Sequence, residues 1–547
     1  MPAGAETVLR RAIARVSSLD PALSEAIATV ACVMLPYECL LEYDYLARPY
    51  KLVGNLAEDL PEISEDGKTY TFKIRRGKFF GPDVCFGADE NGAPKSRELT
   101  AEDFVYSLKR LADVRNSSPG YWIIENRVAG IGEFREASKT AEDRTDYSMP
   151  VRGLRAPDAH TLVIELDKPN PDFLWVLAMG FAAAVPHEAV EYYGKQKNTS
   201  FHSVAVGTGP YRLERFRRNH MTEFVLKNKD DGRPEMIDRI VFYVVDDPIT
   251  RWLMFLRGEL DFSEISNDNW NAVIKDGELD SDLFNKRGIR YHTKPGTDVY
   301  YVGFNFDDPV VGNNKKLRQA LSRAFNSDEW VRFNHGRYLP ATSPVPQSID
   351  GWPDTPHPYS YDLEEAKRLL AEAGYPDGID PATGKRLELV LDLGHTDVST
   401  RESAELLASF WAKIGVSLKL QYNNWPAFLS KVAERKSQMF RIGWMADYPS
   451  ALNFLQLFAS KNASPGQNRS NYSNPEFDDL YERAEVETDY EKRMDMIRRM
   501  QDIMREDCPW VLMHYGMVHT LAGPGVENYI PHDYSYGMEK FYGKKRE

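Results

Sequence analysis

One carboxylate inside an aromatic, apolar run is the residue of this chain with the clearest chemical potential. Asp447 lies in Phe440–Pro449, which reads FRIGWMADYP. The first part of this run predicts a short buried strand that ends at a proline turn. A buried carboxylate without a partner is very costly, so we expect Asp447 to meet a cation or a set of N–H donors. An arginine of the protein, the start of a helix or a cation of a ligand can serve, and the rest of the chain favours the ligand.

Several common catalytic and cofactor-binding motifs are missing from the sequence. It contains neither the G-x-S-x-G nucleophile elbow nor the G-x-x-x-x-G-K-[ST] phosphate loop. The segment Gly207–Tyr211 lacks the third glycine of a dinucleotide loop, and Pro210 removes an N–H, so the segment indicates a turn. His187–Glu191 begins like a zinc-protease helix but lacks the second histidine. These patterns favour binding over catalysis.

Composition and charge limit the classes of partner. The 547 residues are 42% hydrophobic and 12% aromatic, enough for about two or three domains. The aromatic residues fit large cores, or walls against which peptides or sugars stack. The 68 Lys and Arg face 82 Asp and Glu, a net charge of −14, which disfavours nucleic-acid binding because phosphates require a basic surface.

Apolar stretches are too short for a membrane span. The longest one near the start, Ala26–Pro36, is about half of the 20 residues that a transmembrane helix needs. The acids Asp20 and Glu25 precede it, so it also makes a poor signal-peptide core. We expect a soluble body whose export signal has been removed.

The four cysteines have no metal-ligand spacing. Cys32 and Cys39 can form a bridge in an oxidising compartment or remain buried free thiols, and the sequence leaves both open.

Strand and turn signals dominate the first third of the chain. Leu9–Val16 predicts a strand, and Thr69–Arg75 alternates with period two after a turn at Glu65–Lys68. Thr100, with Asp103 three residues later, predicts the capped start of a helix, and Leu162–Leu166 predicts another strand.

After Pro169 helices alternate with strands. Asp362 predicts a helix cap, with Gly374 as the stop, and Asn474 followed by Pro475 opens another helix. The helical spacing of Met496, Ile497, Met500, Ile503 and Met504 predicts core packing. Interleaved helices and strands indicate α/β sheets, and the hairpin-rich insertion indicates a discontinuous, multi-domain body.

Nine segments, in this order and spacing, carry a resemblance to a known family. They are Ser18–Pro21, Leu56–Glu58, Asp66–Phe72, Leu99–Ser107, Val206–Tyr211, Asn305, Arg318–Leu321, Ala366–Tyr375 and Gly443–Tyr448. On these segments the chain resembles the extracellular solute-binding proteins of ABC importers, in the peptide/nickel-type group called family 5. The resemblance runs nearly from end to end.

This resemblance implies a mixed α/β fold with two lobes, the periplasmic-binding-protein fold of type II, cluster C. It places residues 1–48, 170–297 and 516–547 in the first lobe and residues 298–515 in the second. Residues 49–169 are expected to form an extra domain of the first lobe. In such folds the ligand is trapped between lobes that close about a hinge.

The resemblance also implies a peptide site. Asp447 would receive the α-ammonium, an arrangement with strong charge-assisted hydrogen bonds that rejects ligands lacking the cation. Gly443–Met445 and Glu25–Ile27 would pair with the peptide backbone as added strands do, and Arg441 would meet a carboxylate. The expected aromatic walls are Tyr121, Trp425, Trp444 and Tyr515. A disulfide that some family members carry beside the motif is absent, because its positions correspond to Asp298 and Met445.

The implied function is that of a non-catalytic receptor, monomeric and without cofactor or metal. It would capture short peptides in the periplasm or another extracytoplasmic space, with a lipid anchor left open, and deliver them to the membrane permease of an ABC importer. Three alternatives remain at this point. They are a binder of an oligosaccharide or of a nickel or haem complex, a periplasmic hydrolase, and a sensory or chaperone protein.

Overall fold

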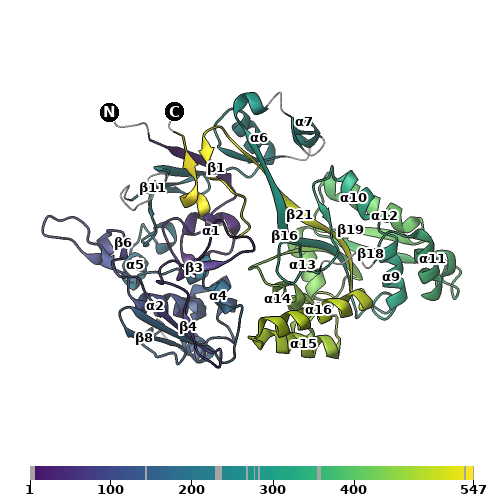
Figure 1. Ribbon diagram of the computed structural model, residues 1–547, viewed down its shortest axis with the longest axis horizontal. Helices are drawn as coiled ribbons and strands as arrows, with labels where there is room; N and C mark the ends of the chain where they lie inside the picture. Colours follow the sequence, from purple (N-terminus) through teal and green to yellow (C-terminus); the bar gives the residue numbers. More distant parts are fainter. Residues whose placement is uncertain are drawn as a thin grey trace. The chain divides into compact units, whose positions relative to one another are not determined.

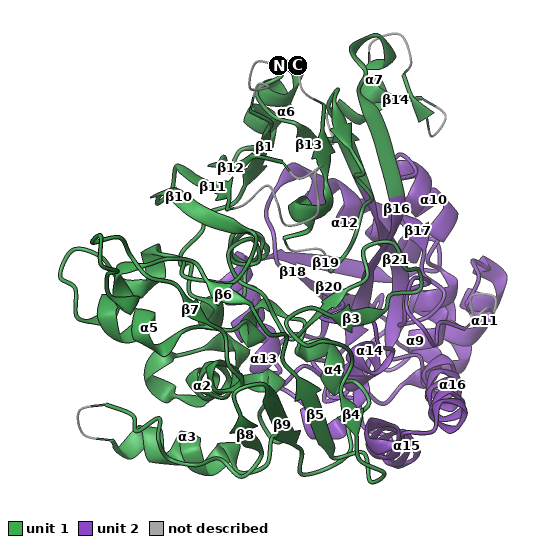
Figure 2. Ribbon diagram, turned by 60° about the vertical axis from the view of Figure 1, so that its left-hand side comes forward, with its two compact units in different colours: residues 1–293, 519–547 green, residues 294–518 purple. Residues whose placement is uncertain are grey.

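The computed structural model describes the chain except for residues 1–5, 142–143, 228–236, 266–268, 276–277, 281–283, 354–358, 535–536 and 546–547. It divides into two compact units (Figure 2). Unit 1 contains residues 1–293 and 519–547, and unit 2 contains residues 294–518. The predicted three-part division, with a separate body for residues 49–169, stays a prediction.

Two four-stranded sheets dominate unit 1. The first has the order β1 (Val8–Ile13), β12 (Arg239–Val244), β11 (Met221–Leu226), β10 (Tyr211–Arg217), and the second has the order β4 (Glu62–Ile63), β5 (Thr69–Lys73), β9 (Thr161–Glu165), β8 (Leu154–Asp158). Two-stranded pairs add β2 (Leu41–Tyr43) with β3 (Leu52–Gly54), β6 (Phe79–Phe80) with β7 (Arg97–Glu98), β14 (Ile274–Lys275) with β15 (Glu278–Leu279), and β22 (Val526–Glu527) with β23 (Gly543–Lys544). The helices are α1 (Ile27–Val33), α2 (Ala101–Ala112), α3 (Ile131–Thr140), α4 (Phe173–Val176), α5 (His187–Gly194), α6 (Pro248–Leu256) and α7 (Trp270–Val273).

Local signals in unit 1 fold as predicted. The strand predicted from Leu9 is β1, the period-two segment is β5, and the strand predicted from Leu162 is β9. Helix α2 begins with the predicted capping box, in which Asp103 accepts from the backbone N–H of Thr100 at 2.8 Å. The glycine turn at Val206–Tyr211 is explained by packing, because a Cβ at Gly207 would lie 2.0 Å from the carbonyl oxygen of Pro36.

A buried ion pair fixes the segment before α1 to helix α2. The terminal nitrogens Nη1 and Nη2 of Arg110 donate to the two carboxylate oxygens of Asp20, at 2.8 and 2.7 Å. Both side chains are almost fully buried. Burial alone would raise the pKa of Asp20, but the Arg110 charge and the N–H of Ala22 outweigh it and keep this pKa below 3.8. The acid of the Ser18–Pro21 motif is thus a structural anchor of unit 1.

We expect Arg110→Leu to lower the free energy of unfolding by about 3–5 kcal/mol, because it leaves Asp20 buried and unpaired. A depressed carboxylate pKa stabilises above the unfolded value and loses its contribution as pH falls through the folded value, so the difference from wild type should narrow in acid. Urea unfolding at pH 7 and at pH 3, below the unfolded value, measures both. The exposed pair of Arg15 and Asp246 is the control, since Arg15→Ala should cost less than about 1 kcal/mol. A similarly small loss for Arg110→Leu would contradict the anchor.

One mixed sheet organises unit 2. Its strands run in the order β21 (Trp510–Ala522), β16 (Arg290–Phe304), β20 (Met439–Met445), β18 (Glu388–Leu393), β19 (Ser417–Tyr422), with β17 (Leu339–Pro340) beside β21 and β13 (Phe262–Glu264) on the part of β21 in unit 1. The helices are α9 (Lys315–Arg323), α10 (Ser327–Phe333), α11 (Leu363–Glu372), α12 (Val398–Ala412), α13 (Trp425–Ala433), α14 (Leu452–Leu455), α15 (Pro475–Val486) and α16 (Tyr490–Asp507). Figure 1 shows α9, α11 and α12 beside β18 and β19, and their apolar faces close the core.

Helix signals in unit 2 are also confirmed. Asp362 caps α11 by accepting from two backbone N–H groups, and Gly374 follows the helix with a φ of +95°. Asn474 caps α15, with Pro475 as its first residue. Of the predicted α16 core residues, Ile497, Met500, Ile503 and Met504 are buried, and Met496 is half-buried.

The cysteine question is settled in favour of thiols. All four cysteines are free, and Cys32, Cys39 and Cys508 are buried. The thiol of Cys39 donates to the carbonyl oxygen of Met179 at 3.2 Å, and burial raises its pKa.

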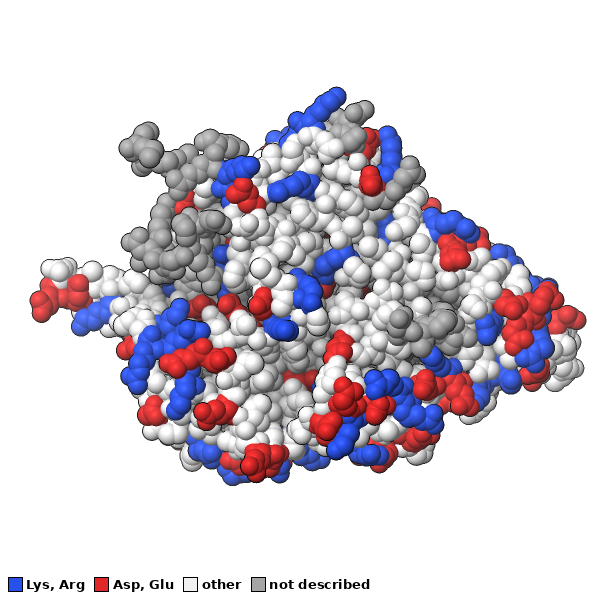
Figure 3. All heavy atoms as spheres, viewed as in Figure 1, with Lys and Arg blue, Asp and Glu red and all other residues white. Residues whose placement is uncertain are grey.

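Membrane-spanning helices and surface charge bear on the possible partners. Among them no helix combines the length and hydropathy that crossing a bilayer requires. On the face shown in Figure 3, acidic and basic side chains alternate rather than forming one basic field.

Candidate functional site

Strand β20 carries the residues of the predicted site. It is antiparallel to β16, so Gly443 faces Tyr300 and Met445 faces Asp298 across the pair. The ring of Tyr300 covers Gly443, where a Cβ would lie 2.7 Å from it, which explains the glycine. The two positions at which a disulfide was predicted to be absent are therefore direct neighbours.

In the described part of the chain, the end of β20 has a neighbouring strand on one side only. Its parallel pairing with β18 stops where Leu393 meets Arg441, whereas its pairing with β16 continues to Met445. Gly443 and Trp444 are half-buried, and Met445 is 52% exposed. The backbone of this segment therefore has one edge that an extended ligand can join.

Asp447 lies two residues beyond β20 and is exposed, which corrects the prediction of a buried acid. Trp444, within the strand, is half-buried. Asp447 is exposed because the strand ends at Met445 and the chain then leaves the sheet. The buried amide of Asn453 holds it there, donating to the carboxylate at 2.9 Å and accepting from the Asp447 N–H at 3.1 Å. The same amide oxygen accepts from the indole N–H of Trp444 at 3.0 Å, so one side chain positions both predicted residues.

Arg441, also on β20, supplies a guanidinium group close to Ser403 of α12. Its Nη1 donates to the hydroxyl of Ser403 at 2.9 Å, and among the described residues it forms no ion pair. Burial lowers the pKa of Arg441 to about 10, although Tyr338 and Asp397 nearby act in the opposite direction. The group therefore remains charged at neutral pH, and it is suited to an anion that displaces water.

Arg441 and Gly443–Met445 line a hollow of about 420 Å³ in unit 2, whereas Asp447, beyond the end of β20, is not among its lining residues. Its walls come from β16, α10 and the loop after it, the start of α12, the start of α13, β20 and β21. The lining residues are Asp298, Tyr300, Trp330, Asn334, Tyr338, His395, Ser399, Thr400, Ser403, Trp425, Arg441, Ile442, Gly443, Trp444, Met445, Met513 and His514. Trp425 is 42% exposed and stacks on His395, with 5.4 Å between ring centroids. The predicted residues Arg441, Gly443, Trp444, Met445 and Trp425 are thus brought together.

The remaining predicted residues lie elsewhere. Glu25 and Ile27 are exposed in unit 1, around Ala26, whose extended backbone precedes α1. Tyr121 is also in unit 1, where it is nearly buried under the guanidinium of Arg135. Tyr515 is fully buried in unit 2, with its hydroxyl bonded to the backbone of Ser343. Their roles toward a ligand stay predictions.

Several residues of the hollow were missed by sequence reasoning. Tyr300, Trp330, Tyr338, His395 and His514 come from separate elements, and Asn453 belongs to the short helix α14. None stands in a motif. Only the packing of the strands, helices and loops of unit 2 brings them together. One signal was available for Asn453, since a polar residue inside the apolar run Leu452–Leu455 is expected to bond to a neighbouring group.

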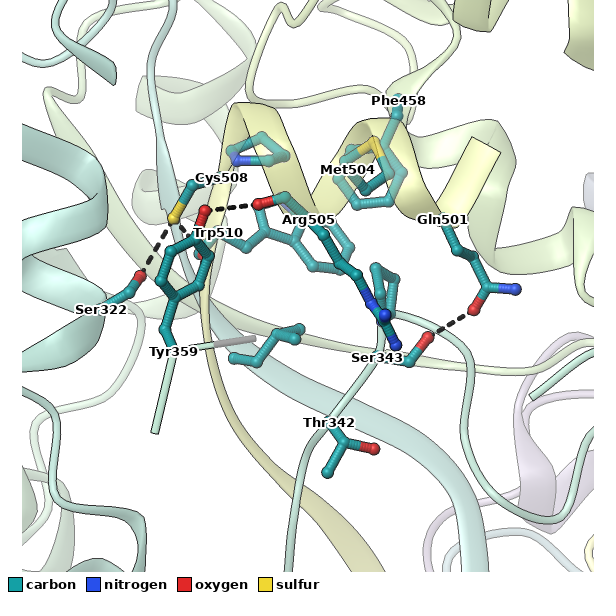
Figure 4. A pocket seen from close by; sticks show the side chains of 13 residues that line it. Ser322, Thr342, Ser343, Tyr359, Phe458, Gln501, Met504, Arg505, Cys508 and Trp510 are labelled. Carbon is teal, nitrogen blue, oxygen red and sulfur yellow. Dashed lines mark hydrogen bonds between the residues drawn. The ribbon is translucent and has the colours of Figure 1, made fainter. Parts of the chain in front are cut away.

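A second cavity in unit 2 is too small for such a ligand. It measures about 30 Å³, room for about one or two water molecules. Figure 4 shows the groups around it, including the bonds from Ser322 to Cys508 and from Ser343 to Gln501. Among the described residues no group of three or more potential metal ligands occurs.

Comparisons with known proteins identify the family of the chain. Residues 51–466 match the profile described as bacterial extracellular solute-binding proteins, family 5 middle. The chain belongs to this family of solute-binding proteins. Family 5 proteins similar to it include the dipeptide-binding protein of Escherichia coli, 26% identical over 88% of this chain and 84% of that protein. Heme-binding protein A of Haemophilus influenzae is 27% identical over 88% and 82%.

The fold of this solute-binding protein is that of solved periplasmic binding proteins, as predicted. The periplasmic binding protein DppA of Helicobacter pylori, solved with the peptide STSA, superposes with a TM-score of 0.73 at 24% identity. The match covers 99% of this chain and 98% of that one.

We expect Asn453→Ala to lower the free energy of unfolding by about 1–3 kcal/mol, because it leaves two donors without their acceptor. These donors are the indole N–H of Trp444 and the backbone N–H of Asp447. Urea unfolding measures the loss. The matched control is Asn91→Ala at an exposed turn, which should be nearly neutral. An Asn453→Ala variant as stable as this control would show that the amide does not hold the turn.

Proposed function

We propose that this protein captures short peptides outside the cytoplasm and delivers them to the permease of an ABC importer. It acts as a monomeric receptor without enzymatic activity. The family membership supports the solute-binding role, and the dipeptide-binding relative and the peptide complex of the Helicobacter protein support the choice of peptide.

The observation that carries the proposal is the order of three features along β20 and the turn after it. A carboxylate, Asp447, follows a segment with an open backbone edge, and a guanidinium, Arg441, lies at the start of that segment. A peptide in extended conformation has the complementary order, with an ammonium at one end, backbone N–H and C=O groups, and a carboxylate at the other. The segment Glu25–Ile27 of unit 1, with Tyr121 as a wall, is proposed to complete the site on ligand binding.

The dimensions favour a ligand of about three to five residues. The four residue steps from Arg441 to Met445 span about 13 Å at about 3.3 Å per residue. A peptide backbone covers at most about 3.6 Å per residue, so this range of lengths reaches both charges.

We expect Asp447→Asn to weaken the binding of tetraalanine by about 2–5 kcal/mol, because it removes the acceptor of a desolvated ammonium. Titration calorimetry with tetraalanine and N-acetyl-tetraalanine measures this. The acetylated peptide lacks the cation, so its already weak binding should hardly change. Equal losses for the two peptides would count against Asp447 as the ammonium site.

Native mass spectrometry of the purified protein distinguishes the remaining ligand classes. We expect added masses that correspond to short peptides and that persist unchanged after incubation, since no cleavage is proposed. A haem or oligosaccharide mass would instead assign the site to those ligands, and peptide fragments that accumulate with time would indicate a hydrolase.

A further inference from the structure

His514, on β21, occupies the floor of the hollow between aromatic rings. The ring of Tyr338 lies 4.0 Å from it between centroids and that of Tyr300 lies 4.6 Å away, both nearly parallel to the imidazole. His514 is only 6% exposed. The imidazole plane is therefore fixed by stacking on neighbouring rings.

The proton position on His514 follows from one hydrogen bond. The indole Nε1–H of Trp330, itself buried, points at Nδ1 of His514 at 3.1 Å. An indole nitrogen can only donate, so Nδ1 must accept and must carry no proton. Burial, with a smaller effect of the Arg441 charge, lowers the pKa of His514 to about 3, so the ring is neutral at physiological pH. A neutral ring without a proton on Nδ1 carries it on Nε2.

Among the described residues nothing hydrogen-bonds to Nε2 of His514, although the ring lines the hollow. Arg441 lines the same hollow, and its charge acts on His514. Ser399, Thr400 and Ser403, on the first turns of α12, add hydroxyl groups and the positive end of a 15-residue helix. A buried donor, a cation and a helix start therefore line the same hollow, with Asp397 as the acid that caps the helix.

We propose that His514 is a specificity-determining residue of the peptide site, whose Nε2–H donates, beside Arg441, to a carboxylate of the ligand. This inference rests on the proposed function. A carboxylate has two acceptor oxygens and can take one bond from each residue, whereas a carboxamide would turn donors of its own toward them. The neutral imidazole adds a directed donor without a second buried charge, which would repel Arg441. Trp330 is the positioning residue that keeps the proton on the side of the hollow.

The ligand carboxylate can come from the C-terminus or from an acidic side chain. Tetraalanine offers only the former, and Ala-Ala-Asp-Ala-amide offers only the latter. Tetraalanine amide offers neither and gives the reference affinity. Calorimetric titration of the wild type with these three peptides assigns the source.

The decisive variant is His514→Phe, which keeps an aromatic ring in the stack and removes the donor. We expect it to weaken the binding of the preferred acid by about tenfold to a hundredfold and to leave the binding of tetraalanine amide within about twofold. His514→Gln, whose amide restores a donor near the position of Nε2, should recover part of the preference. His220→Phe, at an exposed position of unit 1, is the matched control and should change neither affinity.

A spectroscopic readout covers the case in which His514→Phe does not fold. Proton–nitrogen spectra of the wild type should show His514 protonated at Nε2, and that proton should shift with the preferred acid but not with the amide. Trp330→Phe should release the tautomer and reduce the preference for the acid.

The possible outcomes separate the two proposals. If the wild type binds all three peptides equally, or if His514→Phe keeps the full preference for the acid, the role of His514 is overturned while peptide binding stands. If the wild type binds none of the peptides, the proposed function itself fails and this inference falls with it.

Discussion

Charge pairing between protein and ligand is the physical constraint on which the proposed peptide site depends. A peptide brings an ammonium and a carboxylate, and each loses its hydration when the ligand is enclosed. The protein must offer groups of opposite charge at matching places, and Asp447 and Arg441 lie at the two ends of the segment that can pair with a backbone. The exposure of Asp447 agrees with this, because a carboxylate in water costs nothing until a ligand covers it.

Buried side chains hold two groups of the proposed site in place, the Asp447 carboxylate and the neutral imidazole of His514. Asn453 links the turn of Asp447 to the indole of Trp444, and Trp330 fixes the imidazole of His514. Both are almost fully buried, and each forms a hydrogen bond to a residue that lines the hollow, Asn453 to Trp444 and Trp330 to His514. The lining of the hollow is therefore preorganised, which would reduce the entropy cost of binding the proposed ligand.

Local sequence signals predicted much of the fold and part of the site. Caps such as Asp362 and Asn474, and the alternation of Thr69–Lys73, act within a few residues and were confirmed. Arg441–Met445 is one strand, so its members are found together once the strand is known. His514 and Trp330 are 184 positions apart, on β21 and α10. Only the tertiary fold brings them into contact, and no local sequence pattern predicts that contact. The exposure of Asp447 was missed for a similar reason, since the end of a strand depends on the partner that stops pairing.

The most direct test of the account is a crystal structure of this protein with tetraalanine. The account predicts the ligand ammonium within about 3.2 Å of the Asp447 carboxylate, and a ligand backbone paired with Gly443–Met445. It also predicts the terminal carboxylate toward Arg441. A peptide bound in the reverse direction, or bound away from β20, would contradict the central claim.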